Sequence, residues 1–398
     1  MSDVRRQPPG PFAVVGISLG SLAAATFAVV AFGALAPALQ DEFGFSNAEI
    51  GLLVALVFLG AGVTSVPAGR LTDRVGPTLV LGWSLALFTA AMAVVAVAPT
   101  VAVFLVAVTI GGLVYGGINP PTNVVVAGRM TSRLGFFLSI KQSGVPLGGL
   151  LAGLVLPPIA IAVGWRWAML VTVAACALIA ALTPLLRGAG VTGGRGRSYD
   201  ARSPLSMSET FSLGLFGFAM SGTQWSVFAH LTLFLTDERG FSLALAGVGL
   251  ALVQGLGAAS RLLWGWLSDI PGRRLVILMI LAAGSVACLL ALAGGVDGTA
   301  LWVVLGTAGL VVVGWNGAYY ALIADHAGAM GLGRASANAL IFIFAGSVFM
   351  PPLLGLTVDL TGAWQTFWVV AATVVAVSGV GLYLGLRYPV RHLGRDRT

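Results

Sequence analysis

The chain has 398 residues, of which 58% are hydrophobic and only 9% are charged. Because ordinary soluble domains carry about 25% charged residues, this composition excludes a water-soluble globular fold and predicts a surface that faces lipid. The net charge of +7 falls in loops between apolar segments, so it does not indicate a nucleic-acid-binding protein.

Apolar runs of the length that a membrane helix needs, roughly 20 residues, recur along the whole chain. We expect membrane-spanning helices at 11–37, 49–68, 78–98, 101–126, 136–158, 165–186, 209–236, 243–264, 275–293, 300–324, 335–357 and 363–386. The first run is too long for a signal-peptide core, so we expect it to be retained. The sequence therefore predicts an all-α membrane protein with 12 transmembrane helices.

Arginine residues fall in alternate loops between these helices. With both termini in the cytoplasm, the outer loops contain only Arg166 and Arg239 among the arginines, beside several acidic residues. This is the positive-inside pattern. It predicts a multi-pass protein of the plasma (cytoplasmic) membrane with both termini cytoplasmic and the lipid bilayer as its surroundings.

A polar segment at 188–208, rich in glycine, arginine and serine, divides the chain and indicates a flexible cytoplasmic linker. The same short sequence recurs on either side of it. Gly44-Phe45-Ser46 precedes the second predicted span, and Gly240-Phe241-Ser242 precedes the eighth. We expect two related six-helix bundles, at 1–187 and 209–398, with a ligand site between them as in many secondary transporters.

The loops after the second and eighth predicted helices carry a repeated motif. The copies read Gly69-Arg70-Leu71-Thr72-Asp73-Arg74 and Gly265-Trp266-Leu267-Ser268-Asp269, the second continuing to Arg273-Arg274. They resemble the signature of the major facilitator superfamily (MFS), and the resemblance covers essentially the whole chain. It implies the MFS fold with two pseudo-symmetric bundles, rocker-switch alternating access, and a gating role for Gly69, Arg70, Asp73, Arg74, Gly265, Asp269, Arg273 and Arg274. A charged turn that serves only membrane insertion is the alternative.

Two departures from that family bear on the direction of transport. Many of its proton-coupled drug antiporters carry an arginine in the fourth helix, but the stretch 106–112 has none. The sequence 144–149, Gly-Val-Pro-Leu-Gly-Gly, is similar to the antiporter motif with altered spacing, and a bent, tightly packed helix also explains it. Both departures speak against a proton-coupled exporter of drugs or lipophilic metabolites, which is kept as the alternative function.

Charged side chains inside a span are costly and indicate functional sites. Lys141 lies in the fifth predicted helix and Arg261 in the eighth, while no aspartate or glutamate lies deep in any predicted span. Arg261 also resembles the eighth-helix arginine of the monocarboxylate and oxalate–formate branches, which binds a substrate anion. In the resembled fold these two helices are neighbours at the interface between the halves, which implies that both cations face one cavity. We therefore expect a secondary transporter of a small organic anion, a carboxylate, bound by the two cations. Snorkelling of both side chains to the lipid headgroups is the alternative.

Further polar residues follow helical spacing within the spans. They lie four residues apart on the fourth helix, seven residues from Arg261 on the eighth, and on one face of the tenth, where Trp315 is expected to point elsewhere. Hydrogen bonding between helices is the alternative role. The predicted substrate-binding residues on these faces are Tyr115, Asn119, Gln254, Asn316, Tyr319 and Tyr320.

His230 is the only histidine within a predicted span. It would be able to couple transport to a proton, and a histidine held by hydrogen bonds within the bundle is the alternative. Asp325 and His326 end the tenth predicted helix, where we expect them to form a latch or a capping pair.

Other classes of function find little support in the sequence. There is no phosphate-binding Gly-Lys-Ser/Thr loop, and no metal-ligand or nucleophile–base cluster within the spans. Cys176 and Cys288 both lie in apolar runs, which gives no disulfide framework. We expect no enzyme activity, no cofactor, no metal, no nucleic acid and a monomeric chain. A nontransporting sensor or assembly partner would be expected to carry an added soluble domain, and only the short linker is present.

Overall fold

The computed structural model describes residues 9–130, 134–189, 205–268, 270 and 272–387, which are nearly all helical. The helices of the first half are α1 (Pro11–Ala34), α2 (Ala36–Phe43), α3 (Asn47–Val75), α4 (Pro77–Val97), α5 (Val101–Tyr115), α6 (Asn119–Arg129), α7 (Leu134–Gln142), α8 (Gly144–Val163) and α9 (Trp165–Leu182). Those of the second half are α10 (Met207–Leu233), α11 (Leu243–Ser268), α12 (Arg274–Ala293), α13 (Gly298–Val312), α14 (Asn316–Thr361) and α15 (Trp364–Arg387).

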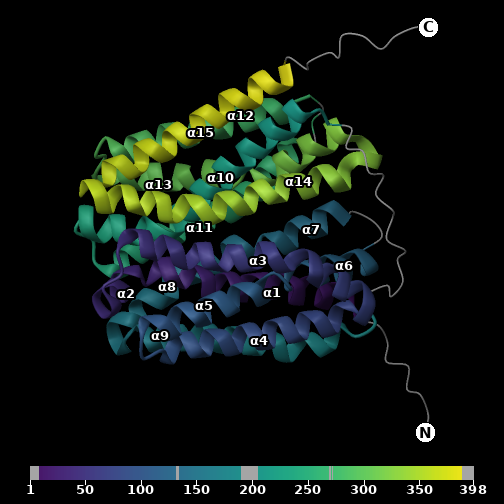
Figure 1. The fold of residues 1–398 in the computed structure, drawn as a ribbon, viewed down its shortest axis with the longest axis horizontal. Coiled ribbons are helices and arrows are strands. Elements are labelled where there is room, and N and C mark those ends of the chain that lie inside the picture. Colours follow the sequence, from purple (N-terminus) through teal and green to yellow (C-terminus); the bar gives the residue numbers. More distant parts are fainter. Residues whose placement is uncertain (1–8, 131–133, 190–204, 269, 271, 388–398) are drawn as a thin grey trace.

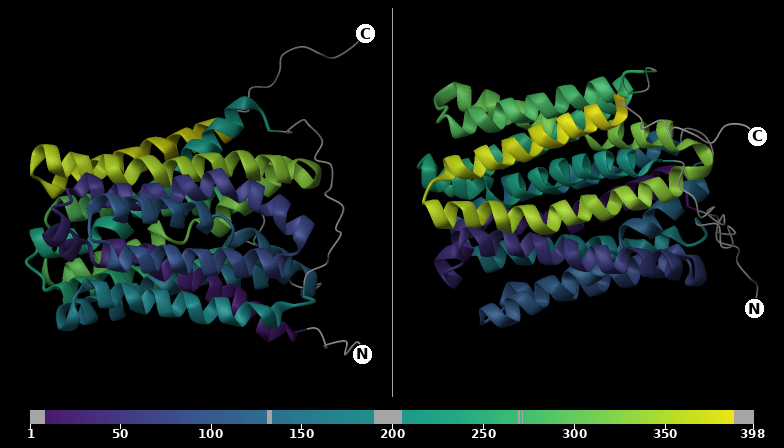
Figure 2. Two further views of the ribbon diagram at one scale, coloured as in Figure 1. Left: turned by 60° about the horizontal axis from the view of Figure 1, so that its bottom comes forward. Right: turned by 45° about the horizontal axis from the view of Figure 1, so that its top comes forward.

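The two halves lie side by side, with α1 to α9 below and α10 to α15 above in Figure 1. Figure 2 shows in two further views that the helices of both halves run along a common direction. The start of α1 and the end of α15 lie at one end of the bundle, which we call the termini end. The other end is called the opposite end.

The predicted twelve helices are present, although one of them is less apolar than the rest. Eleven helical segments of the described chain are long and apolar enough to cross a membrane. The seventh helix, α10, has 27 residues, and almost every side chain from Leu213 onward is buried. Because neighbouring helices rather than lipid surround α10, polar side chains such as Gln224 and His230 find partners inside the protein.

Three spans are broken near the middle of the bundle. Turns at 116–118, at Ser143 and at 313–315 separate α5 from α6, α7 from α8, and α13 from α14. Pro120 and Pro121 follow the first break, where the missing proline N–H groups cannot continue the helical hydrogen bonds. In a membrane, irregular backbone is tolerated where it is buried in protein or lines a cavity. The breaks therefore indicate where a site lies.

Helix α14 supplies the last part of the tenth span and all of the eleventh, so the chain reverses direction within it. A Cβ atom added to Gly217 on α10 would lie 2.6 Å from the Tyr319 hydroxyl and 3.2 Å from Ile343. Residues so far apart in sequence meet at one point only if the segment turns back. The two parts of α14 thus both pack against α10.

The halves touch at the opposite end through close approaches of backbone. A Cβ atom on Gly33 would lie 2.0 Å from the Phe228 carbonyl oxygen, and one on Gly51 would lie 2.4 Å from Pro351. Small residues permit such approaches between membrane helices. The protein is therefore closed at the opposite end.

Polar contacts join the halves at the same end. The Asp359 carboxylate accepts hydrogen bonds from the Asn47 N–H at 2.9 Å, the Asn47 side-chain amide at 2.8 Å and the Ala48 N–H at 2.8 Å. The first N–H groups of a helix have no partner within it and favour negative charge. Asp359 of the second half therefore caps α3 of the first half.

A methyl group on Gly33 should disturb this closed end. We expect Gly33→Ala to push α1 away from α10 and lower the closed population, because the added Cβ meets backbone that cannot rotate away. Spin labels at the exposed positions Asp41 and Glu238 would report the change as a longer inter-label distance. Gly16→Ala on the same helix is the control, since its Cβ would meet no atom within 4 Å. Identical distance distributions in both variants would contradict the prediction.

Candidate functional site

A cavity of about 360 Å³ lies between the two halves, bordered by residues of nine helices and of the breaks at 116–118 and 313–315. Its polar lining consists of Ser65, Asn119, Asn123, Gln142, Ser221, Gln224, Arg261 and Asn316. Its aromatic lining consists of Phe58, Tyr115, Trp225, Trp315 and Phe344. No aspartate or glutamate of the described residues lines it. A larger hollow of about 740 Å³ borders α4 and the segment after α9, but among the described residues only those of the first half and Gly188 line it.

Arg261 on α11 places its guanidinium at this cavity. Its Nη1 donates a hydrogen bond to the Gln142 carbonyl oxygen at 2.9 Å, across the interface between the halves. Its Nε–H is buried and has no hydrogen-bond partner among the described residues. An unpaired N–H on a buried charge is costly, so the geometry leaves a donor for a ligand acceptor.

Lys141 on α7 lies behind the cavity wall and does not line the cavity. Its side chain is completely buried, and its ammonium donates to the Asn119 amide oxygen at 2.7 Å, to the Asn123 amide oxygen, and to the Thr122 hydroxyl at 3.4 Å. The structure therefore brings Lys141 and Arg261 to the same site in different roles. Arg261 faces the cavity, and Lys141 contacts two amides that do so.

The residues around the break between α13 and α14 differ from the prediction. Asn316 lines the cavity as predicted, but Trp315, which was expected to point elsewhere, also lines it. Trp315 donates its indole N–H to the Gln224 amide oxygen at 3.0 Å. The expectation for Trp315 was wrong because helical spacing does not extend across a break in the helix.

Two tyrosines predicted at the site lie beside it in this structure. The Tyr319 hydroxyl donates to the Leu213 carbonyl oxygen at 2.9 Å, and its ring stacks on Phe216 with centroids 6.1 Å apart. The Tyr320 ring packs against Tyr319. Neither is among the residues that line the cavity, so their substrate-binding role stays a prediction.

Of the predicted site residues Tyr115 and Gln254, one lies at the cavity and the other lies away from it. Tyr115 lines the cavity, whereas Gln254 is completely buried where α11 packs on α8. A Cβ atom on Gly149 would lie 2.0 Å from the Gln254 side-chain nitrogen. Both polar atoms of Gln254 lack a partner among the described residues.

Sequence reasoning missed the contribution of α10 to the cavity. Gln224 and Trp225 line it, and Phe58 of α3 packs on Trp225 with ring centroids 4.4 Å apart. A signal was available, because the run of polar residues from Ser221 to Ser226 interrupts an otherwise apolar span. Such a run suits a helix that faces protein or an aqueous cavity rather than lipid.

The first motif copy lies at the termini end. Arg70, Asp73 and Arg74 are exposed there, and no cross-half hydrogen bond or ion pair involves them within the described part of the chain. Gly69 has open space around it, since a Cβ atom would meet nothing within 4 Å. The gating role of this copy stays a prediction.

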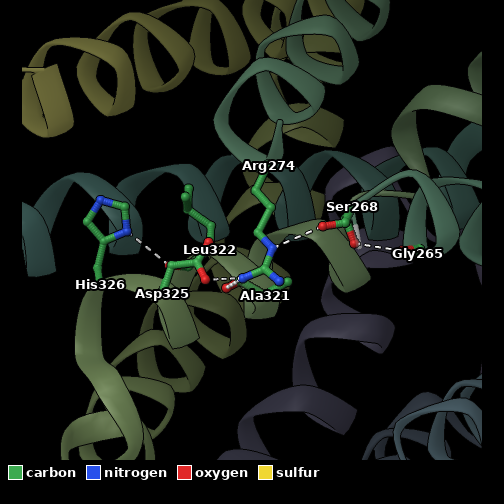
Figure 3. A network of polar contacts seen from close by, with 7 residues as sticks. All are labelled: Gly265, Ser268, Arg274, Ala321, Leu322, Asp325 and His326. Atoms are coloured by element: carbon green, nitrogen blue, oxygen red, sulfur yellow. Dashed lines mark hydrogen bonds and ion pairs between the residues drawn. The ribbon is translucent and has the colours of Figure 1, made fainter. Parts of the chain in front are cut away.

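The second motif copy forms a network within one half (Figure 3). Arg274 donates to the Ser268 carbonyl oxygen at 3.0 Å and the Ala321 carbonyl oxygen at 2.9 Å, and pairs with Asp325. Arg274 thereby links α12 to the end of α11 and to α14. The network also includes the Ser268 hydroxyl, which donates to the Gly265 carbonyl oxygen at 2.7 Å.

His326 does not pair with Asp325, although the two residues are adjacent in sequence. Among the described residues, His326 has a hydrogen-bond contact with the Leu322 carbonyl oxygen of its own helix, at 3.1 Å (Figure 3). Asp325 was expected to pair with His326, and it pairs with Arg274 instead. Arg273 is exposed, and Asp269 lies outside the described residues. The ion pair joins helices of a single half and is not a latch between the halves.

His230 lies at the closed opposite end, away from the cavity. Its Nε2 is 2.9 Å from the Asn47 carbonyl oxygen of α3, and its Nδ1 is 3.0 Å from the Ser226 carbonyl oxygen. A neutral imidazole carries one N–H and can donate to only one of them. Its role in proton coupling stays a prediction. Asp237 lies in the short helical segment Phe234–Glu238 that follows α10, where burial raises its pKa and the carboxylates of Asp41 and Glu238 raise it further.

Metal chemistry has no basis in the described residues. They contain no group of three or more histidine, cysteine, aspartate or glutamate side chains that would hold an ion. Cys176 and Cys288 are free and buried. The groups available to bind a ligand at the cavity are the Arg261 guanidinium and the side-chain amides, beside several aromatic rings.

Two helical bundles with a polar cavity between them are the architecture of many secondary transporters. The sequence model described as Major Facilitator Superfamily matches residues 17–337, and the chain belongs to this family. An uncharacterized MFS-type transporter of Mycobacterium tuberculosis is 28% identical over 91% of this chain and 83% of its own. The family places the chain among multi-pass membrane transporters.

Two further relatives are named for a cargo, and a solved structure shares the fold. A gentisate transporter of Corynebacterium glutamicum is 30% identical over 40% of this chain and 35% of its own. A hexuronate transporter of Bacillus subtilis is 23% identical over 84% of this chain and 85% of its own. The structure of a bacterial homolog of the human lysosomal transporter Spinster has a TM-score of 0.77 at 16% identity, covering 95% of this chain and 96% of its own.

Proposed function

We propose that this protein is a secondary active transporter of small organic carboxylates that works by rocker-switch alternating access. The observation that carries the proposal is the Arg261 guanidinium, which lies at a cavity between the halves with an unpaired Nε–H. A guanidinium donates two parallel hydrogen bonds to a carboxylate. A substrate anion would supply the negative charge that the described cavity lining lacks.

The names of two relatives support the same substrate class. Gentisate and hexuronate, for which they are named, are both organic carboxylates. The cavity volume of about 360 Å³ lies at the small end of the range for ligand sites, roughly 300–1,000 Å³. A small acid is therefore the expected cargo.

The arrangement of the halves supports alternating access. The cavity lies between the halves, and Gly33, Gly51 and Asp359 hold the opposite end closed. We infer that the termini end is cytoplasmic, as the arginine distribution predicts, which makes this an inward-facing state in the plasma membrane. The bundles at 1–187 and 209–398 would rock as units joined by the segment 188–208, in a monomer.

A ligand panel on the purified protein tests this function. Benzoate and gluconate should raise the thermal unfolding temperature in proportion to their binding, because a ligand that binds only the folded state stabilises it by mass action. Benzamide, which has the ring without the charge, should have no such effect. Stabilisation by a lipophilic cation such as tetraphenylphosphonium, with none by either acid, would overturn the proposal in favour of the exporter.

A further inference from the structure

Five amide side chains line the cavity, and protein donors occupy the oxygen atoms of three of them, Asn119, Asn123 and Gln224. The Lys141 ammonium bonds the oxygens of Asn119 and Asn123, and the Trp315 indole bonds the oxygen of Gln224 at 3.0 Å. An ammonium and an indole N–H can only donate. These contacts therefore fix the amide orientations, and each NH₂ group is left without a protein partner among the described residues.

The cavity consequently presents donors to a ligand. The Arg261 Nε–H has no partner among the described residues, and the amides of Asn119, Asn123 and Gln224 have their oxygens engaged, which leaves their NH₂ groups to face a ligand. Amide and hydroxyl oxygens remain on few lining residues, chiefly Gln142, Asn316 and Ser65. A carboxylate, which only accepts hydrogen bonds, fits this lining well.

A sugar acid fits such a lining less well than an acid without hydroxyl groups. Each of its hydroxyl groups brings an O–H donor into the cavity, and a buried donor without an acceptor weakens binding. Sites that leave buried polar groups of a ligand unpaired reject that ligand strongly. The polyhydroxylated tail of a hexuronate-like or gluconate-like molecule would leave several donors unpaired.

The rest of the wall suits a planar ring. Phe58, Tyr115, Trp225, Trp315 and Phe344 all border the cavity. Phe58 lies at the centre of this group, with its ring centroid 4.4 Å from Trp225, 6.0 Å from Tyr115 and 6.3 Å from Phe344. Aromatic walls favour aromatic ligands through offset-stacked and edge-to-face contacts.

We infer that the substrate is an aromatic carboxylate and that Lys141 is the positioning residue that makes the cavity select it over sugar acids. The inference rests on the proposed function and deepens it. Arg261 binds the carboxylate. Lys141 never touches the substrate but holds the oxygens of Asn119 and Asn123 away from it. Removing Lys141 would free those oxygens to accept from sugar hydroxyls.

The test compares binding of benzoate and gluconate by isothermal titration calorimetry in the parent and in Lys141→Met. The parent should bind benzoate at least tenfold more tightly than gluconate. Methionine has a similar length to lysine but no hydrogen-bond donor. In Lys141→Met the ratio of the gluconate dissociation constant to the benzoate dissociation constant should therefore fall by about tenfold or more. Lys141→Arg keeps a donor-only side chain and should retain most of the parent's preference.

Controls separate positioning from a structural role. Arg129→Met removes a cation from the same region, where Arg129 bonds only the Pro9 carbonyl oxygen among described contacts, and should leave the ratio unchanged. If Lys141→Met fails to fold, Asn123→Asp serves instead, because it keeps Lys141 paired and adds acceptor oxygens to the cavity. It should lower the same ratio.

The outcomes distinguish this inference from the proposed function. If neither acid binds the parent, the carboxylate function itself is wrong. If both acids bind and the parent shows no preference for benzoate, the aromatic substrate class is wrong while the carrier function stands. If Lys141→Met weakens the binding of both acids by the same factor, Lys141 supports the fold and does not determine substrate specificity.

Discussion

Arg261→Gln should weaken carboxylate binding by roughly 10- to 150-fold. A hydrogen bond to a charged group contributes about 1.5–3 kcal/mol, and each 1.4 kcal/mol is a factor of about ten in affinity. Glutamine removes the charge and the planar fork that a carboxylate engages. Arg261→Lys keeps the charge without the fork, so its affinity for the carboxylate should lie between those of the parent and Arg261→Gln. Titration calorimetry with benzoate measures both variants.

A matched variant controls for the loss of one positive charge. Arg166 pairs with Glu42 at 2.9 Å and is partly exposed at the opposite end. Arg166→Gln should therefore leave benzoate affinity within about twofold of the parent, since exposed ion pairs contribute only about 0–1 kcal/mol. Equal effects of the two substitutions would show that Arg261 acts through overall charge or folding rather than by contact with the ligand.

Asp359→Asn should open the opposite end of the protein. The carboxylate accepts three hydrogen bonds from the first turn of α3, and its charge faces the positive end of that helix dipole. Asparagine keeps one acceptor oxygen and loses the charge. Charge-assisted hydrogen bonds are roughly twice as strong as neutral ones, so we expect the ratio of closed to open protein to fall by about tenfold or more.

Distances between spin labels at Asp41 and Glu238 measure this change in the absence of substrate. The control is Asp297→Asn, because Asp297 pairs with Arg239 within the second half at 2.9 Å and does not cross the interface. The control should keep the parent's distance distribution. A closed population as large in Asp359→Asn as in the parent would falsify the assignment of Asp359 as a contact that holds the halves together.

Some parts of the site were visible in the sequence because they follow from local chemistry. Arg261, Asn119, Tyr115 and Asn316 are polar residues inside apolar runs, and all four line the cavity. Burying such groups is costly without a partner, so their presence alone signals a site. The same argument, applied to the polar run in α10, would have found Gln224.

Other parts depended on how the helices pack. Lys141 was predicted to face a cavity together with Arg261, but a neighbouring helix interposes Asn119 and Asn123 between Lys141 and the cavity. Trp315 faces the cavity because the helix breaks beside it. Neither the break nor the neighbour follows from the spacing of residues along a single helix.

By itself, the sequence determined the membrane class, the positions of the spans and the family. Each apolar run enters lipid by its own hydrophobicity and closes its own backbone hydrogen bonds, so a span needs no distant partner to be recognised. The tertiary structure alone decided which residues share the cavity, which oxygens are engaged, and which end is closed. These depend on side-chain orientation and on contacts between residues hundreds of positions apart, such as Asn47 and Asp359, which no local pattern encodes.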